Sequence, residues 1–201
     1  MPPAPSVRKA TMADIDPLAA ALASAFADDP IFQWLFPQRN RTKTYQQFFV
    51  HDLKKMHIPH DETWTTADGI RGGALWAPPG QWRQSVWQMA ASLPHYAAIL
   101  GTKLPKALRA LTVIENAHPP GEHYYLAVLG TDQRFQGQGV GGACLEPVLT
   151  RCDEQGIGAY LESSKEKNIP FYNRHGFEVT RELPLPNGGP SVWLMWRDPR
   201  N

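Results

Sequence analysis

The sequence predicts an α/β fold in a single domain, and three observations carry this prediction. Segments with the helical spacing of apolar residues alternate with short β-rich segments along all 201 residues. A glycine-rich loop stands between a strong strand and a helix. The chain contains no internal repeat and no linker long enough to divide it into two domains. Its length is that of one domain with a sizeable core.

Composition and charge exclude several classes of protein. Hydrophobic residues make up 42% of the chain, charged residues 19%, and the net charge is +1 at pH 7. Neither nucleic acid nor a membrane is therefore an expected partner. The first residues lack the charged and apolar regions of a signal peptide, and no apolar run is long enough to span a bilayer.

The two cysteines are expected to stay unpaired. Cys144 and Cys152 lie eight residues apart on one predicted helix. This spacing separates them by about 12 Å along the helix axis, which is too far for a disulfide. Free thiols indicate a reducing compartment, so the expected location is the cytoplasm. No Cys-x-x-Cys pair is present, and no metal site is expected.

The N-terminal part predicts a strand and two helices. Residues 1–5 are rich in proline and are expected to form a flexible tail, followed by a short strand over residues 6–10. Thr11 begins a helix whose apolar residues keep helical spacing as far as Phe26. An Asp-Asp-Pro sequence ends this helix, and residues 42–57 form the second one.

A hairpin and a helical insertion come next. Residues 63–66 and 70–77 are rich in β-forming residues, and the Asp-Gly between them predicts a hairpin turn. Residues 82–118 form a largely helical insertion. Breaks in its helices are expected at Pro94, Gly101 and Pro105.

The C-terminal part alternates strands and helices. Residues 123–130 form a strong strand, and residues 140–154 form a helix with a local kink at Pro147. The remaining elements are a strand over residues 159–162, a short helix over 169–174, and two closing antiparallel strands over 177–183 and 191–197.

The segment Gln136-Gly-Gln-Gly-Val-Gly-Gly142 indicates a phosphate-binding loop. Closely spaced glycines let the backbone turn sharply and leave its N–H groups unobstructed. At a helix N-terminus these groups and the macrodipole bind phosphate oxygens. A cofactor that carries a pyrophosphate is the expected ligand. A nucleotide P-loop would need Gly-Lys-Ser/Thr, whereas Ala143 and Cys144 follow here.

A dinucleotide fingerprint is a closer alternative. Gly137, Gly139 and Gly142 fit G-x-G-x-x-G, and Glu162 stands 20 residues beyond the last of them. Two observations count against it. About six residues separate the strand from the first glycine, and only about 40 residues follow Glu162, too few to complete a doubly wound sheet.

A third pattern, Q/R-x-x-G-x-G/A, is matched by Gln136, Gly139 and Gly141. Downstream, the segment Asn168-Ile-Pro-Phe-Tyr-Asn-Arg-His-Gly-Phe177 matches N-x-x-x-Y-x-x-x-G-F at every marked position. Together these segments resemble the GNAT superfamily of N-acetyltransferases. The runs Leu-Ala-Val-Leu-Gly over 126–130 and Leu-Glu-Ser-Ser over 161–164 are similar to its puromycin N-acetyltransferase branch. The resemblance is clear over the C-terminal half and looser over residues 31–118.

The resemblance implies a more detailed fold and a cosubstrate. The fold is a mixed, mostly antiparallel sheet flanked by helices on both faces, in one domain over residues 1–201. The cosubstrate is acetyl-CoA, which enters where the strand over 123–130 splays from the next strand. The residues implied to bind it are Val128, Leu129 and Gly130 at the pantetheine arm, Gln136, Gly137, Gln138, Gly139, Val140, Gly141 and Gly142 at the pyrophosphate, and Asn168.

Acetyl transfer to an amine sets the remaining chemical tasks. The amine must lose a proton, the oxyanion must be stabilised, and the leaving thiolate must be protonated. The resemblance makes Tyr172 the general acid, and Glu162 is the first choice of general base. Weaker candidates for the base are His123, Asp28, Asp29 and Glu115. His175 is expected to be structural.

The expected acceptor is a primary amine of a small molecule, an antibiotic or a metabolite, acetylated directly in a ternary complex. The residues expected to line its pocket are Phe26, Asp29, Phe32, Trp34 and Trp76. Two other functions stay open: a non-catalytic acyl-CoA-binding sensor on the same fold, and an NAD(P)-binding oxidoreductase. The identity of the acceptor and the choice between monomer and homodimer stay undecided.

Overall fold

A computed structural model describes residues 5–36, 40–83 and 85–200 and contains a seven-stranded sheet of order β1-β2-β3-β4-β5-β7-β6. The strands are β1 Val7–Lys9, β2 Thr63–Thr66, β3 Gly72–Ala77, β4 Tyr124–Thr131, β5 Ala159–Ser163, β6 Glu178–Pro184 and β7 Ser191–Arg197. Neighbouring strands are antiparallel except β4 and β5, which are parallel. The prediction of a mixed, mostly antiparallel sheet is confirmed, and the doubly wound parallel sheet of the dinucleotide alternative is not the observed topology.

The helices overlap the predicted helical segments, except α2, which lies in a stretch for which no element was predicted. They are α1 Ile15–Ala25, α2 Pro30–Leu35, α3 Arg41–Asp52, α4 Val86–Leu100, α5 Leu104–Ala117, α6 Val140–Gln155 and α7 Ile169–Arg174. Among the described residues, none of these helices has the length and hydropathy needed to cross a lipid bilayer. Most of the predicted N-terminal tail, residues 1–4, lies outside the described residues.

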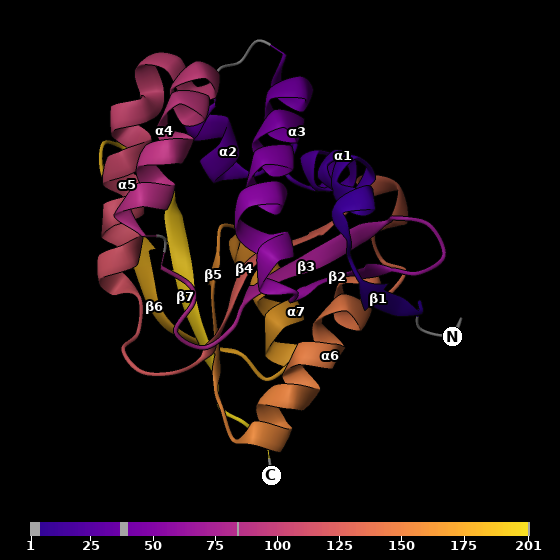
Figure 1. Ribbon diagram of the computed structural model, residues 1–201. Helices are drawn as coiled ribbons and strands as arrows, with labels where there is room; N and C mark the ends of the chain where they lie inside the picture. The colour runs from indigo at the N-terminus through magenta and orange to yellow at the C-terminus, as the bar shows by residue number, and fades with distance from the viewer. Residues whose placement is uncertain (1–4, 37–39, 84, 201) are drawn as a thin grey trace.

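Helices cover both faces of the sheet, as two neighbouring residues of β3 illustrate. Trp76 belongs to a core that also contains residues of α6 and α7, whereas Leu75 belongs to a core with residues of α1 and α3. Successive strand side chains point to opposite faces. Hence α6 and α7 lie on one face of the sheet, and α1 and α3 lie on the other. In Figure 1, α1 and α3 lie above β2 and β3, and α6 lies below them.

The helical insertion forms the α4–α5 pair, which lies near β6 and β7 at one end of the molecule (Figure 1). The predicted breaks at Gly101 and Pro105 are confirmed, because a short 3-10 turn over Gly101–Lys103 separates the two helices and Pro105 stands in the first turn of α5. The predicted break at Pro94 is wrong, since Pro94 lies inside α4. Pro94 and Ala90, one turn earlier, are both exposed, so water can bond the carbonyl that the proline leaves free.

The second predicted helix, over residues 42–57, changes its geometry before it ends. The α-helical part stops at Asp52, and a π-helical turn continues over Leu53–His57. This wider turn brings Asp52 and His57 into contact, with 3.1 Å between Oδ2 and Nε2. Turns of this kind are frequent at functional sites, and both side chains line the cavity described below.

Glycines bound α6 at its two ends in the left-handed conformation. Gly139 is the N-cap residue with φ 80°, and Gly156 is the C-cap residue with φ 66°. The inward face of α6 carries Cys144 and Cys152, which are buried and unpaired, as predicted. Burial raises the pKa of both thiols to about 12. These cysteines therefore serve as core residues.

Candidate active site

The sheet opens between its two parallel strands. The pairing of β4 with β5 runs from Tyr124 opposite Ala159 to Leu126 opposite Leu161 and stops there. Beyond this point β4 continues to Thr131 and β5 to Ser163. The second half of β4 is thus paired with β3 alone, and its other edge is available to a ligand that adds to the sheet.

A β-bulge coincides with the opening. Leu75 pairs with Val128 and Trp76 pairs with Leu126, so Ala127 has no partner in β3. Bulges re-aim side chains and are frequent beside active sites. Past the bulge, Val128 packs toward the core of α1 and α3, whereas Leu129 packs toward the core of α6 and α7. This segment of β4 therefore borders both faces of the sheet.

The glycine loop lies on the face of α6 and α7. Gly137 and Gly139 have φ of 77° and 80°, a conformation that favours glycine. A Cβ atom at Gly141, in the first turn of α6, would lie 3.3 Å from the ring of Phe171 in α7. The start of α6 therefore packs directly on α7, which carries Tyr172 and follows Asn168. The two segments of the sequence motif meet in space.

Tyr172 is buried beside this loop, with 8% of its surface exposed. Its ring contacts the rings of Phe171 and Phe177 edge-on, at centroid distances of 5.3 Å and 6.1 Å. Burial, together with the charge of Asp29, raises the pKa of Tyr172 above its ordinary value. The phenol is therefore protonated throughout the physiological pH range and can donate a hydrogen bond.

Glu162 lies on the opposite face of the sheet, because it alternates with Leu161, which packs in the core of α6 and α7. Its carboxylate accepts a hydrogen bond of 2.7 Å from the hydroxyl of Tyr125 at Oε2. The other oxygen, Oε1, is buried without a hydrogen-bond partner in the described part of the chain and lies 3.7 Å from Nδ1 of His118. A proton on that nitrogen would satisfy this oxygen.

Two histidines extend this cluster. Nε2 of His118 lies 2.8 Å from Nε2 of His123, and Nδ1 of His123 donates a hydrogen bond of 3.0 Å to the carbonyl of Gly121. Burial, and then the neighbouring His118, lowers the pKa of His123. A neutral His123 with its hydrogen on Nδ1 has a bare Nε2. His118 therefore donates from Nε2, and its Nδ1 is left as the position that can accept a proton.

A cavity of about 360 Å³ lies on the same face as Glu162. Residues of α2, α3, α4, α5 and β4 line it, among them Phe32, Phe48 and Leu104, and most of its wall is apolar. At Ala127 and Val128 the cavity borders the opening of the sheet. At His118 and Tyr125 it borders the residues that surround Glu162. Pockets with apolar walls and a few converging polar groups are typical binding sites for small molecules.

Of the residues predicted to line an acceptor pocket, Phe32 lies in the wall of this cavity. Phe26 packs behind it against Phe32 and Phe49, with ring centroids 4.9 Å and 5.4 Å away. Trp76 is fully buried in the core that contains Tyr172. Phe26 and Trp76 therefore pack behind the site and do not line the cavity.

Asp29 and Trp34 also have packing roles. One oxygen of Asp29 accepts hydrogen bonds from the first amides of α2, at 2.9 Å and 3.1 Å, and the other accepts from the hydroxyl of Ser164. This carboxylate thus fastens α2 to the segment after β5. Trp34 packs on the core formed by α5, β5 and β7, with the ammonium of Lys106 3.9 Å from its ring centroid.

The weaker base candidates are dispersed. Asp28 forms surface ion pairs with Lys165 and Lys167, whereas Glu115 lines the cavity. His175 has a structural contact, since its Nδ1 lies 2.9 Å from the carbonyl oxygen of Phe171. Within the described residues, His, Cys, Asp and Glu side chains do not gather in groups of three or more suited to a metal ion.

Sequence reasoning missed His118 and the indole above it. The ring of Trp82 stacks on His118 at a centroid distance of 3.6 Å and an interplanar angle of 20°. Each residue adjoins a Pro-Pro-Gly segment that marks a loop in the sequence. The two Pro-Pro-Gly segments flank the same helical insertion. This position in the sequence was the signal that could have indicated that Trp82 and His118 lie close together.

Comparison with known proteins agrees with this geometry. The model of the acetyltransferase (GNAT) family matches residues 30–177. An uncharacterized N-acetyltransferase of Schizosaccharomyces pombe is 26% identical over 92% of this chain and 80% of its own length. Mycothiol acetyltransferase of Propionibacterium freudenreichii is 40% identical, but over 32% of this chain and 21% of its own length.

Solved structures share the fold. A histone acetyltransferase HPA2-related acetyltransferase from Corynebacterium glutamicum superimposes with a TM-score of 0.76 and 26% identity, covering 99% of this chain and 98% of its own. The polyamine N-acetyltransferase of Drosophila melanogaster, which forms N-acetylagmatine, has a TM-score of 0.64 at 17% identity over 96% and 98% of the two chains.

Proposed function

Because the chain belongs to the acetyltransferase (GNAT) family, we propose that it transfers the acetyl group of acetyl-CoA directly to a primary amine of a small molecule. The single observation that carries this proposal is the opening between β4 and β5. The glycine loop and Tyr172 lie on one face of the sheet at this opening, and an apolar cavity reaches it from the other face. The whole chain, residues 1–201, acts as one catalytic domain in this proposal.

The residues around the opening suit acetyl-CoA, which supplies an acetyl group activated as a thioester. The second half of β4 has no partner on one edge, so the backbone of Val128, Leu129 and Gly130 suits the pantetheine amides. The amides of residues 136–142 suit the pyrophosphate at the start of α6. Asn168, the N-cap residue of α7, is a further proposed contact of the cosubstrate.

We propose that the cluster of Glu162, His118 and His123, on the cavity face of the sheet, removes the proton from the amine. His118 lines the cavity, and its Nδ1 is the nitrogen left without a hydrogen, 3.7 Å from Oε1 of Glu162. We assign proton acceptance to His118 and stabilisation of the resulting imidazolium to Glu162. Glu162 thus keeps a role in acid–base chemistry, but acts through His118 rather than on the amine.

Tyr172 assists the leaving thiolate from the other face. A phenol has an ordinary pKa near 10 and a thiol near 8.5, and burial raises the pKa of Tyr172 further. Full proton transfer from this phenol to a free thiolate is therefore uphill. Tyr172 instead donates a hydrogen bond to the sulfur as the carbon–sulfur bond breaks, and the proton released by the amine replaces any that the phenol gives up.

A small-molecule acceptor is supported by neighbours in structure and by motifs in sequence. Proteins with this fold include an agmatine N-acetyltransferase and an arylalkylamine N-acetyltransferase of Aedes aegypti, with TM-scores of 0.66 and 0.65. The motifs over residues 126–130 and 161–164 favour the puromycin N-acetyltransferase branch. We therefore propose that the acetyl acceptor is a small-molecule amine rather than an amino group of another protein.

Two measurements test this function. Acetyl-CoA should raise the melting temperature of the protein, whereas NADH and NADPH at the same concentrations should not, because stabilisation follows from binding to the folded state. Acetyl-CoA together with an amine should release free CoA thiol and acetylated amine in equal amounts. Binding without release in a broad amine screen would favour the sensor, and stabilisation by NADPH alone would favour the oxidoreductase.

A further inference from the structure

We propose that the cavity between the helical insertion and β4 selects acceptors that carry one amine on a hydrophobic chain or ring. This inference rests on the proposed acetyl transfer and specifies its substrate class.

The walls form an apolar container for part of a small molecule. Phe32 and Phe48 come from α2 and α3, and Leu100, Leu104 and Leu108 come from the insertion. The volume of about 360 Å³ lies in the usual range for small-molecule pockets. Each methylene group placed there leaves water, which favours binding by about four-fold. The far part of the cavity therefore suits an alkyl or aryl body.

The polar groups gather around Tyr125, which lies next to the opening of the sheet. Its hydroxyl binds Glu162, and the ring of His118 stands edge-on to it at 4.9 Å. Burial, followed by the charges of Glu162 and Asp52, raises the pKa of Tyr125. Asp52 itself lines the cavity with its partner His57. A single ammonium group is therefore expected at this end, with the apolar body directed toward the insertion.

The charge of the wall favours a cation over an anion. Asp52 and Glu115 line the cavity, and none of the described residues in its wall is a lysine or an arginine. A second cation at the far end would lie among leucine and phenylalanine side chains without a partner, which is costly. This arrangement favours a monoamine over a diamine or a polyamine.

The experiment measures kcat/KM for primary amines from n-propylamine to n-octylamine, with phenethylamine, putrescine and agmatine alongside. We expect about a four-fold gain for each added methylene until the cavity is filled, and lower values for putrescine and agmatine than for the monoamine of equal length. A flat series, or a preference for putrescine or agmatine, would overturn the inference. If propylamine is acetylated in that flat series, the proposed acetyl transfer itself stands.

Variants in the two insertion helices sharpen the test. Ala107→Phe fills part of the cavity wall and should shift the optimum to shorter amines by at least one methylene. Leu104→Ala enlarges the wall and should shift the optimum to longer ones. Ala98→Phe places the same ring on an exposed position of α4 outside the cavity and should leave the series unchanged.

A binding measurement keeps the inference testable without turnover. Octylamine should raise the melting temperature of the wild-type protein and of Ala98→Phe, and should raise that of Ala107→Phe less. Equal shifts in all three proteins, or no shift in the wild type, would overturn the cavity as the binding site. Stabilisation by octylamine without any acetyl transfer would instead refute the proposed function and leave the site in place.

Discussion

Nε2 of His118 lies 2.8 Å from Nε2 of His123, and this contact fixes where a proton can be accepted. His123 uses its Nδ1 hydrogen on the carbonyl of Gly121, so its Nε2 accepts and His118 donates. His118 lines the cavity, and its Nδ1 lies 3.7 Å from Oε1 of Glu162, an oxygen without a hydrogen-bond partner among the described residues. In the proposed reaction, this arrangement makes His118 the base that accepts the proton of the amine.

The substitution His118→Gln tests this base directly. The amide nitrogen of glutamine can replace Nε2 as the donor to His123, but nothing replaces Nδ1. We expect kcat/KM to fall by about 10²- to 10⁴-fold, with a small change in melting temperature. The matched control is His95→Gln, at a histidine outside the cavity. A rate within three-fold of wild type for His118→Gln would assign the base elsewhere.

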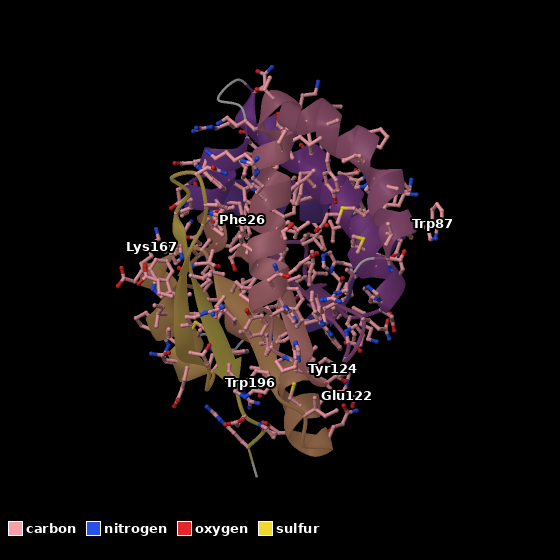
Figure 2. The ribbon with its side chains drawn as sticks, turned by 90° about the vertical axis from the view of Figure 1, so that its left-hand side faces the viewer. Phe26, Trp87, Glu122, Tyr124, Lys167 and Trp196 are labelled. Carbon is pink, nitrogen blue, oxygen red and sulfur yellow. The ribbon has the colours of Figure 1, made fainter. Side chains whose placement is uncertain are left out.

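Tyr172→Phe tests the group that assists the thiolate. We expect kcat to fall by about 10²-fold, while the dissociation constant for CoA, measured by calorimetry, stays unchanged. Tyr124→Phe is a control in the same core, since the hydroxyl of Tyr124 bonds Gln155 at the far end of α6 (Figure 2 labels Tyr124). Equal losses in the two variants would indicate a packing effect rather than a catalytic one.

Gly139→Ala tests the glycine loop, with Gly156→Ala as its control. Both residues have positive φ at the ends of α6, and neither added methyl group would clash. Each substitution should cost about 1 kcal/mol of stability through backbone strain. Only Gly139→Ala should weaken acetyl-CoA binding, by at least ten-fold in a calorimetric titration. An equal affinity in both variants would place the pyrophosphate elsewhere.

The pH dependence of stability follows from His123. Its pKa is lowered in the folded state by burial and by His118, while the unfolded chain keeps a value near 6.5. Below that pH the unfolded chain binds more protons than the folded one. The stabilisation is therefore complete above about pH 6.5 and is lost as the pH falls.

This dependence is measured as the melting temperature between pH 5 and 8. It should fall on the acid side, and it should fall less steeply for His123→Asn, which keeps a donor for the carbonyl of Gly121. His51 and His60 also have lowered pKa values, so the wild-type slope alone does not identify the residue. Identical slopes for the variant and the wild type would contradict the role of His123.

Local signals in the sequence were sufficient for the elements around the cosubstrate. Pro170 in the first turn of α7 and Gly176 with φ 90° after its end bound a helix whose predicted range agrees with the structure. The glycines of the loop and the C-cap Gly156 likewise fix both ends of α6. Such signals act over a few residues and are readable without tertiary contacts.

The acceptor side depends on long-range packing, and here prediction from the sequence failed more often. Trp76 and Trp34 pack in cores, whereas Trp82 stands over His118, although all three are equally aromatic in the sequence. The exposed Trp87 is a further case, projecting from the start of α4 (Figure 2). Only the position of the insertion against α3 and β4 decides which aromatic residues border a cavity.

The central claim is that an amine in the cavity meets acetyl-CoA at the opening between β4 and β5. The most direct measurement incubates the protein with acetyl-CoA and octylamine and quantifies CoA thiol and N-acetyloctylamine by mass spectrometry. We predict equal amounts of both products, formed at a rate that saturates with each substrate. Thiol release that is independent of octylamine, with no acetylated product, would contradict the account.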